Sequence, residues 1–141
     1  MILIAEAINI MSKTIGPAMK ECDAKPVQKL AKGETEAGVD YLDLNIGPAR
    51  KVGDKLMAWL VDTVQQASDL PLSLDTSNYA ATEAGLKLCK KQALVNSVSL
   101  QPERLEVGLP LAKKYNADMV GPREGAHIPA YLKSWRDQGG K

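Results

Sequence analysis

The sequence predicts an α/β protein with a parallel sheet, and three observations support this fold class. Short apolar runs typical of buried strands alternate five times with longer stretches of helical period. Successive apolar runs begin roughly 20 to 40 residues apart, which leaves room for a helical crossover between parallel strands. The composition agrees, because 141 residues that are 45% hydrophobic suffice for one domain with a buried core.

The first β-α unit is expected at the start of the chain. The apolar run at residues 2–5 predicts a buried strand, with the segment EAIN reaching its carboxyl end. The connection over residues 10–22 is long for a βα loop and contains Gly16-Pro17. We expect an active-site loop or lid here, or a short helix around residues 17–20 that shortens it.

The later helices are predicted from capping residues and apolar stripes. Asp23 is expected to cap the first long helix, which Gly38 ends, and Gly33 in its interior should cost roughly 1 kcal/mol relative to Ala. The next helices are expected to begin near Gly53-Asp54, after Ser77 or Asn78, and at Pro102. Pro110 lies inside the last of these helices and is expected to kink it or split it in two.

The strands are predicted to deliver polar side chains to one edge of the sheet. The further strands are expected at residues 39–44, 72–75, 93–98 and 117–121. Asp or Asn occurs at or near the carboxyl ends of the first four strands, as Asn9, Asn45, Asp75 and Asn96. Because parallel α/β proteins bind ligands at the carboxyl ends of their strands, we expect these four side chains around one polar mouth.

Two architectures are compatible with five β-α units. The count alone favours a small flavodoxin-like, doubly wound sheet, since a complete TIM barrel needs eight strands and about 250 residues. Doubly wound nucleotide-binding domains usually carry a Gly-rich phosphate turn, yet neither GxGxxG nor GxxxxGK[ST] occurs in this chain. Polar residues from four different strand ends suit a barrel mouth. We therefore favour a TIM barrel truncated to about five βα units, with the doubly wound sheet as the alternative.

Charge and composition argue against several other functions. The net charge of +1 predicts no binding to nucleic acid or to an acidic membrane. The apolar run after Met1 ends at Glu6, too short for a signal peptide or a membrane span, so a cytoplasmic protein is expected. Cys22 and Cys89 are expected to be free thiols. His127, the sole histidine, is expected in an exposed loop, and neither a metal site nor a catalytic triad is predicted.

Four segments in order resemble the pterin-binding family, and most of all its methyltetrahydrofolate:corrinoid/iron-sulfur protein methyltransferases. They are EAIN (6–9), DYLDLNIGPAR (40–50), LPLSLDTSN (70–78) and VNSVSLQPERL (95–105). Dihydropteroate synthase and the folate domain of cobalamin-dependent methionine synthase are more distant relatives. The resemblance implies that residues 1–120 are the N-terminal part of a pterin-binding TIM barrel. Residues 121–141 are then a divergent tail, expected to form a loop and a short helix.

The resemblance also implies roles for the polar residues at the mouth. Asp75 and Asn96 are expected to bind the pyrimidine edge of a pterin, with Asn45, Asn9 and Glu6 lining the same site. A carboxylate can accept two parallel hydrogen bonds from the 2-amino group and a ring N–H, while an amide donates and accepts at once.

The reaction implied by the resemblance is a methyl transfer. The N5 methyl group of methyltetrahydrofolate would move to the cobalt of a corrinoid carried by a partner protein. Such a transfer depends on positioning and electrostatic activation, so neither a catalytic nucleophile nor a protein-bound metal is expected.

The chain departs from the family in three respects. Ala7 stands where family members usually have Arg, the similarity fades after Val120, and strands six to eight are missing. In the family those strands supply a further pterin-binding Asp and the Asn that bonds N5. The chain is therefore expected to be a methyltransferase or a fragment of one, or alternatively a pterin- or folate-binding module without turnover. Its open strand edges predict a homo-oligomer or a marginal fragment with little methyltransferase activity.

Overall fold

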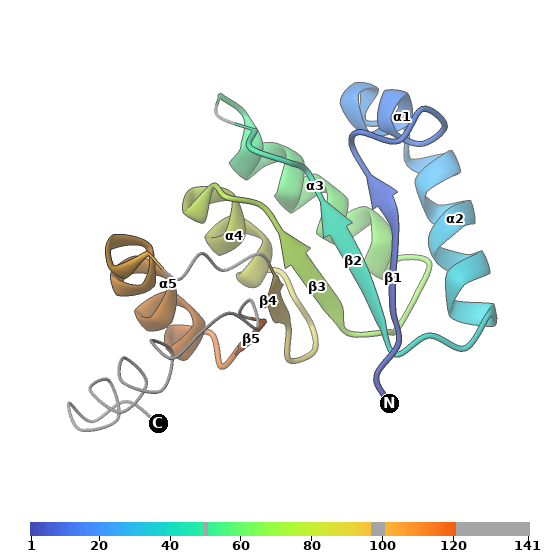
Figure 1. Cartoon of the computed structure of the whole chain (residues 1–141). Coiled ribbons are helices and arrows are strands. Elements are labelled where there is room, and N and C mark those ends of the chain that lie inside the picture. The colour runs from blue at the N-terminus through green and yellow to red at the C-terminus, as the bar shows by residue number, and fades with distance from the viewer. Residues whose placement is uncertain (50, 97–100, 121–141) are drawn as a thin grey trace.

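The computed structural model describes residues 1–49, 51–96 and 101–120, which form a five-stranded parallel sheet with helices between the strands (Figure 1). The elements follow the order β1 (Ile4–Asn9), α1 (Gly16–Glu21), α2 (Ala24–Glu36), β2 (Tyr41–Asn45), α3 (Gly53–Gln65), β3 (Leu72–Asp75), α4 (Tyr79–Leu86), β4 (Leu94–Asn96), α5 (Pro102–Lys114) and β5 (Asp118–Met119). The predicted α/β fold with a parallel sheet is confirmed. None of the described helices is long and apolar enough to cross a membrane. The expected tail at residues 121–141, with His127, lies outside the described residues.

The five strands lie in sequence order, β1-β2-β3-β4-β5, and each neighbouring pair is parallel. The register pairs Leu44 with Leu74 and Leu74 with Val95, and all three side chains are buried. This face of the sheet packs on helices, because a methyl group of Leu74 lies against Gly85 of α4. Helices α3 and α4 lie behind the sheet in Figure 1. The alternate residues of each strand point to the opposite face, which is largely polar in β2 and β3.

The first strand begins later than its apolar residues suggest. The buried strand expected at residues 2–5 is wrong in its limits, because Ile2 is 69% exposed and Leu3 is 48% exposed. The backbone N–H of Leu3 donates to Oδ2 of Asp40 at 2.7 Å, so a side chain holds the chain there. The register shifts between Ala5 and Ile8, a bulge that leaves the two intervening residues exposed. Apolar residues alone therefore did not identify the buried part of β1.

The long connection after β1 contains the short helix α1, which confirms the helical alternative. Ile15 and Met19 anchor this segment in the core, with 5% and 0% of their surface exposed. Gly16 is required at the start of α1, because a Cβ atom there would collide with the carbonyl oxygen of Ile10. The connection is thus packed against the body of the domain.

Two helices begin at the capping residues that the sequence indicates. The carboxylate of Asp23 accepts a hydrogen bond from the N–H of Lys25 at 3.3 Å, which confirms this cap of α2. Asn78, one of two candidates, caps α4 by accepting from the N–H groups of Ala80 and Ala81 at 3.0 and 3.3 Å. Its Nδ2 also donates to the carbonyl of Ala49 at 2.7 Å. One side chain therefore both starts α4 and holds the loop after β2.

Helix α5 runs through Pro110 without splitting, contrary to one of the two expected outcomes. Proline removes one backbone hydrogen bond, which leaves the carbonyl four residues earlier, at Glu106, without its helical partner. Pro110 and Glu106 are both exposed, so water reaches this carbonyl. The buried residues Leu105, Leu109 and Ala112 hold the other side of the helix on the core.

The cysteines are free thiols, as expected. Cys22 is exposed, whereas Cys89 is half-buried. Burial raises the pKa of the Cys89 thiol to about 11, so this thiol stays protonated and unreactive at neutral pH.

The contact between α3 and α4 predicts opposite effects for one substitution at two helical glycines. A Cβ atom at Gly85 would lie 2.8 Å from Leu74 Cδ1 and 2.8 Å from Met57 Cγ, whereas nothing lies within 4 Å of one at Gly33. Gly85→Ala should lower the free energy of unfolding by about 1 to 3 kcal/mol through overpacking. Gly33→Ala should raise it by about 1 kcal/mol, because Ala favours the helix. Urea denaturation gives the free energy of unfolding of both variants. A change of the same sign in both would contradict the packing described.

Candidate functional site

Three of the predicted polar residues form one row at the carboxyl ends of β2, β3 and β4. The register pairs Asn45 with Asp75 and Asp75 with Asn96, so their side chains project from the same face of the sheet. All three residues are half-buried. Nδ2 of Asn45 donates to Oδ2 of Asp75 at 2.7 Å. We call Asn45, Asp75 and Asn96 the carboxyl-end row.

Asn45 also shapes the turn that follows β2. Its Oδ1 accepts a hydrogen bond from the N–H of Gly47 at 2.9 Å. Gly47 has a φ of 62°, a left-handed conformation that favours glycine. Thr76 ties this turn to β3, because its hydroxyl donates to the carbonyl of Gly47 at 2.6 Å. The amide oxygen of Asn45 therefore stabilises the turn, while its amide nitrogen binds the carboxylate of Asp75.

Of the two predicted site residues in β1, Asn9 lies at the level of this row and Glu6 does not. Asn9 is in register with Asn45, so it extends the same edge of the sheet, and its Oδ1 accepts from the N–H of Met11 at 2.9 Å. Glu6 is exposed. Its negative charge reaches the polar face, where it helps to raise the pKa of Asp43. Ligand contacts by Asn9 and Glu6 stay predictions.

A buried carboxylate below the row was not predicted from the sequence. Asp43 is 1% exposed and lies two residues before Asn45 on the same face of β2. Its Oδ1 accepts hydrogen bonds from Oγ of Ser73 at 2.5 Å and from Nδ2 of Asn96 at 3.1 Å. The period-2 pattern of YLDLN is the signal that could have found it: the leucines face the helices, so the aspartate must face the polar side.

The charges on this face favour a ligand that donates hydrogen bonds. Burial is the main cause that raises the pKa of Asp43, and the hydrogen bonds from Ser73 and Asn96 oppose it. The negative charges of Asp75 and Glu6 raise the pKa of Asp43 further. Three carboxyl groups thus influence one small region, and the oxygen atoms of Asp75 lie at its rim. An amino or ring N–H group would find acceptors there.

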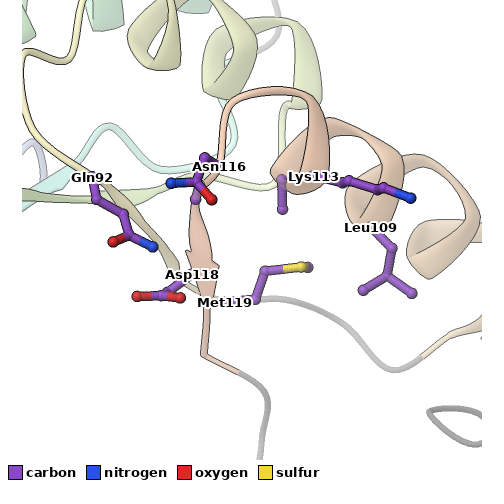
Figure 2. Close-up of a pocket in the computed structure, with 8 residues that line it drawn as sticks. Gln92, Leu109, Lys113, Asn116, Asp118 and Met119 are labelled. Carbon is purple, nitrogen blue, oxygen red and sulfur yellow. The ribbon is translucent and has the colours of Figure 1, made fainter. Parts of the chain in front are cut away.

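A cluster of metal ligands and a surface cavity are the other features that could accompany a ligand site. Within the part of the chain that the structure describes, no group of three or more His, Cys, Asp or Glu side chains is placed to hold a metal ion. A cavity of about 270 Å³ lies beside β5, and Figure 2 shows residues that line it. Its lining includes Gln92, Leu109, Lys113, Asn116, Asp118 and Met119, and none of the predicted site residues. The cavity extends along β5 to Met119, whose strand partner Val95 directly precedes Asn96.

Comparison with known proteins places the row inside a matched region. Residues 9–122 match the pterin binding enzyme family. The chain is 35% identical over 111 residues to a methylcorrinoid:tetrahydrofolate methyltransferase of Eubacterium limosum. The alignment covers 79% of this chain and 41% of that protein, so the chain spans about two fifths of its relative's length.

Because burial raises the pKa of Asp43, the free energies of unfolding of the wild type and Asp43→Asn should differ by an amount that depends on pH. A carboxyl group whose pKa is higher in the folded state binds a proton more tightly in that state. Its contribution to stability is therefore lost as the pH rises from the pKa of the unfolded state through the pKa of the folded state. The variant lacks this contribution. Its free energy of unfolding, relative to the wild type, should therefore rise as the pH increases above the ordinary value of 3.8.

Urea denaturation over a pH series measures this difference. Asp69→Asn, which neutralises an exposed carboxylate before the amino end of β3, controls for the loss of one charge. A difference between wild type and Asp43→Asn that does not change with pH would contradict a raised pKa at Asp43.

Proposed function

Because this chain belongs to the pterin-binding enzyme family, we propose that its carboxyl-end row holds the pyrimidine edge of a pterin. The observation that carries the proposal is the parallel register, which aligns Asn45, Asp75 and Asn96 on one face. The pyrimidine edge offers a 2-amino group and a ring N–H, and a carboxylate accepts two such bonds in parallel. In this proposal Asn9 and Glu6 line the same mouth.

We propose further that residues 1–120 are the N-terminal part of a TIM barrel, with β1 to β5 as its first strands. A doubly wound sheet reverses its strand order at a switch point, where its ligand binds. The described strands instead follow one another in sequence order, as the strands of a barrel do. This order supports the barrel over the flavodoxin-like alternative.

The reaction we propose is methyl exchange between N5 of tetrahydrofolate and a corrinoid carried by a partner protein. In the direction toward the corrinoid, the N5–CH₃ bond breaks, its electron pair stays on nitrogen, and Co(I) supplies the pair for the new Co–C bond. The name of the relative describes transfer from a methylcorrinoid to tetrahydrofolate, the reverse of the direction implied by the resemblance. One site serves both directions, since forward and reverse reactions share a transition state.

A second candidate function is pterin binding without turnover. The row would hold the pyrimidine edge, whereas the resemblance places the group that bonds N5 in strands six to eight. The chain covers 41% of the relative's length, so the relative has more residues than this alignment includes. A chain that holds only the pyrimidine edge would bind the pterin without activating the methyl group.

Substitution at Asp75 tests the proposed binding site. Asp75→Ala should weaken the binding of 5-methyltetrahydrofolate by about tenfold or more, because the ligand's donors lose a charged acceptor. Asp69→Ala is the matched control, since it removes an exposed carboxylate before the amino end of the same strand and should leave affinity unchanged. Isothermal titration calorimetry measures both, and equal affinities for Asp75→Ala and wild type would contradict the site. A methyl-transfer assay with a corrinoid protein then separates turnover from binding alone.

We also propose that the chain self-associates through its outer strands. β1 and β5 form the two edges of the described sheet, and unpaired parallel edges favour association. Ile2, Leu3 and Val120 lie beside these edges and are 69%, 48% and 38% exposed. Size-exclusion chromatography with light scattering should therefore give a mass of at least twice 15.2 kDa. A cooperatively melting monomer would contradict self-association.

A further inference from the structure

We propose that the exposed side of α5 is an interaction surface for a second copy of this chain, with the two α5 helices packed antiparallel. The inference goes beyond the proposed pterin site and does not depend on it. Leu105 and Leu109 of α5 belong to the same buried core as Val95 of β4. The carboxyl-end row lies on the opposite, polar face of the sheet. The surface is also separate from the strand edges, because it belongs to a helix.

One side of α5 carries a stripe with a charge at each end and apolar residues between them. Its members occur at helical spacing and are Glu103, Val107, Pro110, Leu111 and Lys114. Val107 is 51% exposed, and Pro110 is exposed as well. The buried residues of α5 lie on the other side of the helix, where they pack in the core. We call these five residues the α5 stripe, and its apolar centre faces away from the core.

Beside the α5 stripe lies a groove of about 440 Å³ between α4 and α5, which are neighbouring helices in Figure 1. Its apolar lining comes from both helices and consists of Tyr79, Ala80, Val107, Pro110 and Leu111. The hydroxyl of Tyr79 donates to the carbonyl of Arg104 at 2.7 Å. The ammonium of Lys114 pairs with the carboxylate of Glu83 at 2.8 Å. These two contacts join α4 to α5, so the groove exists before a partner binds.

The distribution of charge along the α5 stripe favours a second copy as the occupant. In an antiparallel pair of α5 helices, Glu103 of each copy lies opposite Lys114 of the other, and a two-fold axis repeats the contact. The same register places Val107 opposite Pro110 of the second copy, so apolar surfaces meet at the centre. A parallel pair would set like charges against each other. The stripe is thus complementary to itself in the antiparallel orientation.

Lys114 can serve both its contact within the chain and the contact between copies. Its side chain is 62% exposed, and an ammonium group has three donors, of which Glu83 uses one. The charged pairs lie at the rim of the contact, where they set its orientation. Burial of the apolar centre supplies most of the affinity.

A charge at the apolar centre tests the surface. Sedimentation equilibrium gives the dissociation constant of the pair of copies. Val107→Asp should raise this constant by about tenfold or more, because a carboxylate would be buried against the apolar centre of the second copy. Val52→Asp is the matched control, since Val52 is 58% exposed and lies outside α5. It should leave the dissociation constant unchanged.

Two charge reversals test the antiparallel register. In Glu103→Lys and in Lys114→Glu, each pair of identical copies sets like charges against each other, so both variants should associate more weakly than the wild type. An equimolar mixture of the two variants should recover association, because each contact then joins opposite charges. Lys87→Glu is the control for Lys114→Glu, since Lys87 also interacts with Glu83 but lies outside α5. It should associate like the wild type.

Weaker association of Val107→Asp and of both charge variants, with recovery in the mixture, supports the inference. A dissociation constant of Val107→Asp equal to that of the wild type overturns it and leaves self-association to the strand edges. A mixture that stays monomeric overturns the antiparallel packing. A monomeric wild type overturns this inference together with association through the edges, whereas its binding of 5-methyltetrahydrofolate would leave the proposed pterin site standing.

Discussion

The register of three adjacent parallel strands determines which side chains share a face of this sheet. Because β2, β3 and β4 are aligned residue by residue, their pleats coincide. Leu44, Leu74 and Val95 therefore share the face that packs on the helices. The next residue of each strand, in turn, belongs to the carboxyl-end row. A shift of one residue in any strand would bury a row member against the helices and expose an apolar residue.

The same alignment leaves a carboxylate inside the sheet, and its burial organises the polar face. Asp43 lies out of contact with water, so it needs donors, and the neighbouring strands supply Ser73 and Asn96. These bonds link β2 to β3 and to β4 through side chains as well as backbone. One buried group thus connects the interior of the sheet with the carboxyl-end row, because Asp43 is bonded to both Ser73 and Asn96. Removing Asp43 would leave the buried hydroxyl of Ser73 without this acceptor.

Sequence reasoning succeeded where local chemistry decides and failed where packing across the sheet decides. The caps at Asp23 and Asn78 and the limits of β3 follow from neighbouring residues, and the structure confirms them. The predicted start of β1 was wrong, because an exposed apolar run and a buried one look alike in the sequence. Only the packing of the other elements distinguishes them. Asp43 was missed because the predicted site residues were sought at the strand ends, whereas Asp43 lies within β2. Its role depends on Ser73, 30 residues away in sequence, which no local pattern reveals.

If the carboxyl-end row holds the pterin, the side-chain amide resonances of Asn45 and Asn96 should report its binding. In a two-dimensional ¹⁵N spectrum, adding tetrahydrofolate should shift both amides, because a ligand at the row changes their hydrogen bonds. Asn116 precedes the amino end of β5, away from the row, so its side-chain amide resonance should not shift. Resonance shifts confined to Asn116, with those of Asn45 and Asn96 unchanged at saturating ligand, would contradict binding at the carboxyl-end row.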